Sequence, residues 1–119
     1  MLIGASRHGV VGLLAQTNTP PWLGFKTLWF STPGYQGPFV IRAKRLGRPG
    51  PVSPGATPPT LAPLVVPSGP TIDTVPLRNG RPGYRKVQSV LWVRSPGCYA
   101  WQVDGLGFSE IIVVRATLR

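Results

Sequence analysis

The chain has 119 residues, a length that supports a single domain. Its 13 Lys and Arg residues against 3 Asp and Glu residues give a net charge of +10, which predicts an anionic partner unless the charges serve only to keep the protein soluble. The single cysteine excludes an internal disulfide, and a hydrophobic fraction of 42% argues against a disordered chain in spite of 15 Gly and 15 Pro residues.

The first 21 residues form a poorly defined N-terminal segment. The apolar stretch 9–15 follows Arg7 and His8 and precedes a polar stretch that contains two prolines. It fits three interpretations: a first strand, the start of a truncated chain, or a weak signal peptide. We favour the strand or the truncated start. No apolar run approaches the ~20 residues of a membrane-spanning helix, so we expect no membrane span.

Residues 22–119 are predicted to form one β-sandwich domain without helices, because no segment between the glycines and prolines keeps a helical period over three turns. The strand period is clearest where Phe39 and Ile41 point to one face and Arg42 and Lys44 point to the other. The predicted strands are residues 25–30, 38–46, 71–75, 86–93, 98–103 and 108–116.

Residues 47–70 contain eight prolines and are predicted to form a long semi-rigid loop across the end of the sandwich. Within this loop, residues 61–66 are apolar enough to form a short edge strand. A proline-rich ligand for an aromatic groove is the alternative interpretation of the segment. An Asn79-Gly80 dipeptide predicts a turn in a second loop, residues 76–83.

The C-terminal part of the chain is predicted to form a β-hairpin. Tyr99 and Trp101 occupy alternate positions of the first strand, and Asp104-Gly105 is a dipeptide that favours a tight turn. If Tyr99 faces the core, strand pairing also turns inward Phe108, Glu110, Ile112 and Val114. Because an unpaired carboxylate is costly to bury, Glu110 should lie at the rim or meet a basic residue.

Large aromatic residues are expected to supply most of the core, since each can bury about 150–250 Å². The single cysteine, Cys98, is expected to be buried as a small apolar side chain. The predicted core residues are Trp29, Phe39, Trp92, Tyr99, Trp101 and Phe108.

Two motifs near the C-terminus, Pro96-Gly97-Cys98-Tyr99 and Val103-Asp104-Gly105, precede an apolar strand and resemble the last two strands of bacterial immunoglobulin-like sandwiches. A wider set of motifs is similar to a group of uncharacterised bacterial exported or envelope proteins that end in a Gly-Cys-Tyr, Gln-Val-Asp-Gly, Phe-Ser series. This wider set adds Trp29, Pro33-Gly34-Tyr35, Phe39-Val40-Ile41-Arg42 and Leu91-Trp92. The resemblance covers residues 25–46 and 86–116.

The resemblance implies an all-β, immunoglobulin-like antiparallel β-sandwich that is extracellular or belongs to the cell envelope, with no established activity. It also implies that Tyr99 lies at a strand corner, where its hydroxyl bonds nearby backbone. The chain departs from antibody-type domains because it lacks a second cysteine for an inter-sheet disulfide. It departs from the exported group because no clear signal or lipobox cysteine precedes the domain, so a cytoplasmic location stays open.

Few side chains are suited to catalysis. His8 is the single histidine, and the carboxylate side chains are Asp73, Asp104 and Glu110. Asp104 is assigned to a turn, and no motif surrounds Asp73 or Glu110, so a hydrolase is the weakest hypothesis. One histidine and Cys98 cannot form a closed zinc site, and no phosphate-binding loop is present. We therefore expect no enzymatic activity, no cofactor and no metal.

Two groups of basic residues form the candidate site. Their guanidinium groups could hold phosphates while Tyr84 stacks on a base, but Arg42 and Lys44 alternate with apolar residues as on any solvated strand face. No RNA-binding sheet motif or DNA-binding helix accompanies them. The predicted polyanion-binding residues are Arg42, Lys44, Arg45, Arg78, Arg81, Tyr84, Arg85 and Lys86.

The sequence thus predicts a non-catalytic binding or structural module of the envelope or extracellular space. Its ligand is not identified; an anionic polymer or a protein partner fits the charge. The alternative is a basic nucleic-acid-binding β-domain.

Overall fold

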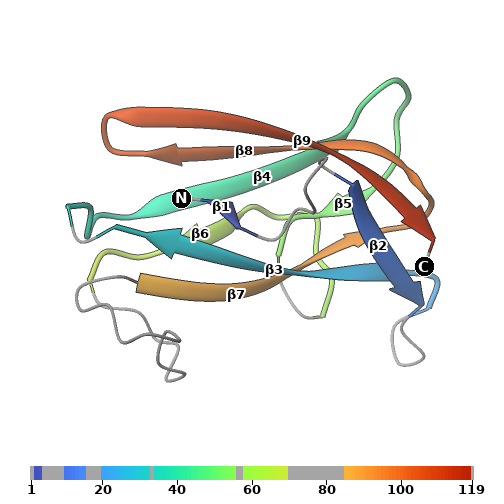
Figure 1. The fold of residues 1–119 in the computed structure, drawn as a ribbon, viewed down its shortest axis with the longest axis horizontal. Coiled ribbons are helices and arrows are strands. Elements are labelled where there is room, and N and C mark those ends of the chain that lie inside the picture. Colours follow the sequence, from blue (N-terminus) through green and yellow to red (C-terminus); the bar gives the residue numbers. More distant parts are fainter. Residues whose placement is uncertain are drawn as a thin grey trace.

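The computed structural model describes residues 2–3, 10–15, 20–32, 34–55, 58–69 and 85–118, and every regular element in these ranges is a strand (Figure 1). The all-β prediction is confirmed for this part of the chain. No described helix is long and apolar enough to cross a bilayer. The strands are β1 (Leu2–Ile3), β2 (Val10–Ala15), β3 (Leu23–Ser31), β4 (Phe39–Arg45), β5 (Val52–Ser53), β6 (Leu64–Val66), β7 (Arg85–Val93), β8 (Gly97–Gly105) and β9 (Phe108–Leu118).

The strands form two sheets, A and B, that face each other. In sheet A, β3 pairs with β7 along its whole length, β5 pairs with the other edge of β7, and β1 pairs with β3. In sheet B the order is β9-β8-β4-β6, all antiparallel. Strand β2 connects the sheets, because it pairs antiparallel with the start of β3 and parallel with the end of β9 (Figure 1).

Most predicted strands form close to their expected bounds. The strands expected at 25–30, 38–46, 86–93 and 108–116 appear as β3, β4, β7 and β9, and the predicted short edge strand appears as β6 at the edge of sheet B. The apolar stretch 9–15 contains β2. The strand expected at 71–75 and the loop expected at 76–83 lie outside the described residues.

The core lies between the two sheets and is built on aromatic side chains. Trp29 of β3 and Trp101 of β8 are fully buried and meet edge to face with ring centroids 5.7 Å apart. Trp29 Nε1 donates to Ser89 Oγ at 2.9 Å, and Ser89 Oγ in turn lies 3.1 Å from Thr27 Oγ1, so this buried indole N–H is satisfied. Phe39 and Tyr99 are buried in the same cluster.

Two predicted core residues differ from that description. Trp92 is buried, but it alternates in β7 with Leu91 and Val93 of the inter-sheet core and therefore lies on the opposite face of sheet A. It packs over Gly24, where an added Cβ would come within 2.7 Å of the indole ring. Phe108 is only partly buried and packs edge to face on Tyr35, with centroids 5.0 Å apart.

The inward face of the C-terminal hairpin is the expected one, but the sequence left the register open, and the turn that sets it lies two residues later than expected. Tyr99 pairs with Val114 and Val103 with Glu110, and Glu110 is exposed at the rim. The strand continues through the expected Asp104-Gly105 turn, and the actual turn is Leu106-Gly107, where Gly107 supplies a φ of +85°. The expected burial of Cys98 is wrong: it occupies the outward position that alternates with Tyr99, and it is exposed.

Both edge strands are short and lie between prolines. Strand β5 is preceded by Pro51 and followed by Pro54, and β6 is preceded by Pro63 and followed by Pro67. Proline has no backbone N–H to offer to a further strand, so these residues limit each edge to a few exposed donors.

Candidate functional site

The members of the predicted basic set that the structure describes are spread over both sheets. Arg42 and Lys44 are exposed on the outer face of sheet B. Lys86 lies in β7, a strand of sheet A. The side chains of Arg45 and Arg85 have other roles, given below. Three members of the set lie outside the described residues: Arg78, Arg81 and Tyr84.

Arg85 is buried, which corrects its assignment to a polyanion-binding face. Its side chain is 3% exposed and donates to backbone oxygens from two loops: Gly37 O at 2.8 Å and Gly69 O at 3.1 Å are the shortest. Its Nη atoms also reach Pro67 O, Tyr35 O and Ser31 Oγ. Because these acceptors occupy both Nη atoms and the side chain is buried, Arg85 joins loops and is not available to an external phosphate.

Arg45 is half-buried and holds the β7–β8 connection. Its Nη1 donates to Ser95 Oγ at 2.7 Å and its Nη2 to Pro96 O at 2.9 Å, while the guanidinium lies 5.7 Å from the centroid of the Tyr99 ring. The Tyr99 hydroxyl donates to Ser95 O at 2.5 Å, which confirms the expected bond from this tyrosine to nearby backbone. Arg45 is therefore a structural residue first.

The outer face of sheet B carries two parallel rows of exposed side chains. Arg42 and Lys44 of β4 form a cationic row, and Ile111 and Val113 of β9, 69% and 55% exposed, form an apolar row. The register places Gln102 of β8 between Arg42 and Ile111, and Ala100 between Lys44 and Val113. The alternation that turns Ile112 and Val114 inward directs Ile111 and Val113 to this outer face, where both are exposed.

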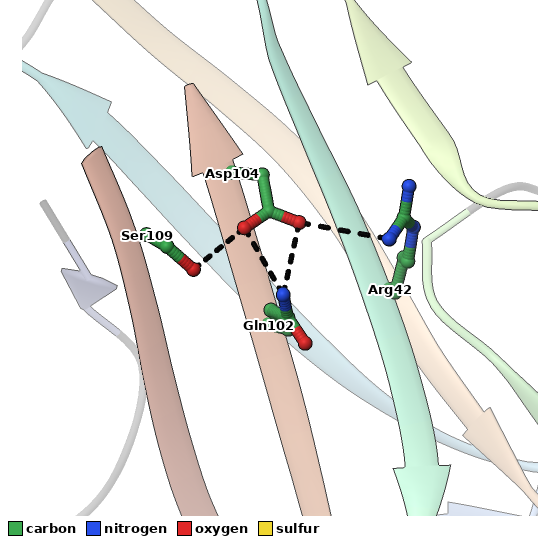
Figure 2. A network of polar contacts seen from close by, with 4 residues as sticks. All are labelled: Arg42, Gln102, Asp104 and Ser109. Atoms are coloured by element: carbon green, nitrogen blue, oxygen red, sulfur yellow. Dashed lines mark hydrogen bonds and ion pairs between the residues drawn. The ribbon is translucent and has the colours of Figure 1, made fainter. Parts of the chain in front are cut away.

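A groove of about 350 Å³ runs between these rows along β8. Ala100 leaves room above the floor of the groove because its side chain is a single methyl group. The amide of Gln102 is turned along the strand, where Nε2 donates to both carboxylate oxygens of Asp104 at 3.1 Å (Figure 2). We call this feature the sheet B groove; it is lined by Arg42, Ala43, Lys44, Ala100, Trp101, Gln102 and Ile111.

Asp104 follows Gln102 on the same face of β8, next to the residues that line the sheet B groove. Ser109 Oγ donates to its Oδ1 at 2.6 Å, and Arg42 Nη1 lies 3.7 Å from its Oδ2 (Figure 2). The hydrogen bonds from Ser109 and then Gln102, assisted by the Arg42 charge, lower the pKa of this carboxyl below its ordinary 3.8. Asp104 thus stays ionised at neutral pH and orients Gln102 and Arg42, a role that its assignment to a turn did not foresee.

The chemistry of the groove is that of binding by charge and apolar contact. Among the described residues, no three His, Cys, Asp or Glu side chains lie together as a metal site would require. Lys44 is exposed and forms no ion pair with a described residue, so its ammonium can meet an anionic ligand. Of the carboxylates weighed as a catalytic pair, Glu110 is exposed and Asp73 lies outside the described residues.

No family model, curated protein or solved structure matches the chain.

Proposed function

We propose that the protein is a non-catalytic binding module that contacts an anionic partner through the sheet B groove. The observation that carries this proposal is the exposure of Arg42 and Lys44 opposite the exposed Ile111 and Val113, with Gln102 and the small Ala100 between the two rows. Cations attract the partner over distance, and the apolar row adds contact energy once the partner is seated.

We further propose that the fold is an immunoglobulin-like sandwich of the cell envelope or extracellular space. Two features support the fold. Strand β3 pairs with β7 in sheet A while β4 pairs with β8 in sheet B, and the Tyr99 hydroxyl is hydrogen-bonded to Ser95 near the start of the penultimate strand. The chain departs from that pattern between β4 and β7, because β5 joins sheet A before β6 returns to sheet B. The envelope location follows from the sequence resemblance alone.

Binding of purified anionic polymers, measured against salt concentration, tests the proposed function. We suggest poly-glutamate and polyglycerol phosphate as probes, with single-stranded oligo-dT for the nucleic-acid alternative. The Lys44→Glu variant should bind the first two probes about tenfold more weakly, because it replaces an attraction with a repulsion. Lys26→Glu is the matched control, since Lys26 is exposed on β3 of the other sheet.

Two outcomes would contradict the proposal. Equal effects of Lys44→Glu and Lys26→Glu would show that binding depends on net charge and not on the groove. A steep salt dependence with oligo-dT and none with the other polymers would favour the nucleic-acid alternative.

A further inference from the structure

The two rows that flank the sheet B groove share the repeat of an extended chain. Along a strand, Arg42 and Lys44 are two residues apart, as are Ile111 and Val113, which corresponds to about 6.8 Å in each row. Across the sheet, β4 and β9 are separated by β8 alone, about 9.6 Å. The groove between them is therefore wide enough for one backbone and has side chains on both flanks at regular intervals.

A polypeptide in extended conformation carries the complementary pattern. Its side chains alternate between its two sides, and those on one side recur at the same 6.8 Å, about two residues. Laid along β8, such a segment would direct alternate residues toward the cationic row and the intervening residues toward the apolar row. Carboxylates would then meet Arg42 and Lys44 while aliphatic side chains meet Ile111 and Val113.

We propose, on the basis of the proposed function, that the occupant of the sheet B groove is an extended segment of a protein partner in which acidic and aliphatic residues alternate. The segment lies on the face of the sheet and is recognised by its side chains. Charges beyond the two ends of the groove determine where the segment can carry acidic residues. Asp104 repels a carboxylate of the segment at one end, whereas the exposed Arg115 of β9, opposite Cys98, can bind one at the other end.

Two other occupants fit this face less well. A second copy of the chain would bring Arg42, Lys44 and Arg115 toward the same residues of its twin, and each chain carries a net charge of +10. Nucleic acid binds by base stacking on exposed aromatic rings, but the rows here are aliphatic, and Trp101, which lines the groove, is 1% exposed.

A pair of synthetic peptides tests whether the groove recognises the two-residue alternation of acidic and aliphatic side chains. Both contain equal numbers of Glu and Val, about eight residues in all to span the described length of β8; in one the residues alternate, and in the other they form two blocks. Charge and composition are thus identical. The alternating peptide should bind the intact chain about tenfold more tightly than the block peptide.

Three variants locate the binding. Lys44→Glu and Ile111→Ser should each remove most of the preference for the alternating peptide, whereas Val65→Ser should not, because Val65 is equally exposed on β6 at the edge of the sheet. Circular dichroism melts of each variant show whether the fold is kept. Ala100→Leu, which fills the groove floor, should also weaken the alternating peptide.

The outcomes separate this inference from the proposed function. If both peptides and poly-glutamate bind alike and all depend on Lys44, the inference fails while the proposed function holds. If Lys44→Glu has no more effect on any probe than Lys26→Glu, the proposed function and the inference fail together. Oligo-dT binding that competes with the alternating peptide would also overturn the inference, because the face would then accept polyanions without regard to period.

Discussion

Two of the connections that cross from sheet A to sheet B, β3–β4 and β7–β8, share a tyrosine and an arginine but differ in how deeply the arginine is buried. They lie at opposite ends of the long axis (Figure 1). At each, a Pro-Gly dipeptide precedes a tyrosine, Tyr35 in the first connection and Tyr99 in β8, and an arginine lies beside that ring. At the first, Arg85 is 3% exposed and has five acceptor residues; at the second, Arg45 is half-buried and has two.

This difference shows how backbone carbonyls can hold a buried cation. Among the described residues, no acidic side chain is a hydrogen-bond partner of Arg85; carbonyl and hydroxyl oxygens disperse its charge, and the rings of Tyr35 and Phe39 lie 5.8 and 5.5 Å from its guanidinium carbon. In exchange, Arg85 joins the 32–38 connection to residues 67–69. Arg45 secures one connection only, so the two arginines should differ in their contribution to stability.

The largest expected effect is the loss of Arg85. Arg85→Met should lower the free energy of unfolding by about 3 kcal/mol, because it removes charged hydrogen bonds and leaves buried carbonyls without a donor. Urea denaturation measures the loss. Arg85→Lys keeps the charge but cannot reach two loops at once, and should be intermediate. Arg115→Met, an exposed arginine of β9, controls for the change in net charge; an equal loss there would refute the assignment.

The tyrosines should follow the same order as the arginines. The Tyr35 hydroxyl donates to Pro38 O and accepts from the Leu106 N–H at 2.9 Å, so it ties the first connection to the hairpin turn; the Tyr99 hydroxyl donates to Ser95 O. Tyr35→Phe should cost about 1.5 kcal/mol and Tyr99→Phe about 1 kcal/mol. A larger loss for Tyr99→Phe in chemical denaturation would reverse the comparison.

A smaller effect is expected for Arg45. Arg45→Met should lower the free energy of unfolding by about 0.5–1 kcal/mol, since the bond to Pro96 O is exposed and water can replace it. The methionine keeps most of the apolar contact with Tyr99. A loss as large as that of Arg85→Met would show that burial does not explain the difference between the two connections.

The smallest expected effect concerns the acid dependence of stability, to which Asp104 contributes and Arg85 and Arg45 do not. Because the folded pKa of Asp104 is lowered, its ionised form stabilises the fold above the ordinary carboxyl pKa, and this contribution disappears as the pH falls through the folded value. Asp104→Asn should therefore lose a small part of the acid dependence of the melting temperature between about pH 6 and pH 2. Arg45→Met and Arg85→Met should keep that acid dependence, since neither arginine is paired with a described carboxylate. Glu110→Gln, which removes the charge of an exposed carboxylate, is the control for the loss of one negative charge alone.

Much of the fold could be predicted because periods of two are visible in the sequence. The alternation of Tyr99, Trp101 and Val103 predicts the inward face of β8 and, through strand pairing, that of β9, but it leaves the hairpin register open. The turn was misplaced because two dipeptides, Asp104-Gly105 and Leu106-Gly107, both offer a glycine at its second position. The structure uses the second dipeptide because strand pairing continues as far as Gly105 and Phe108. The residues of the turn alone do not reveal how far that pairing extends.

The site was predictable only in part. Arg42 and Lys44 were found because they alternate with Phe39 and Ile41, whose burial forces them outward. Arg85 was misassigned because charge and sequence proximity to Tyr84 said nothing about the carbonyls that surround it. Those acceptors come from residues 31–37 and 67–69, and only the folded chain brings them to one point.

The prolines beside β5 and β6 also determine how this protein can associate at high concentration. Templated cross-β growth requires a free edge of about six residues on which the next chain can be laid. Here β5 and β6 offer two and three residues before a proline interrupts them, so neither strand can serve as such a template. A further chain would have to add elsewhere, and the part of β9 before Arg115 is the longer open edge among the described strands, because it pairs with β8 on one side and β2 covers only the end of β9 on the other.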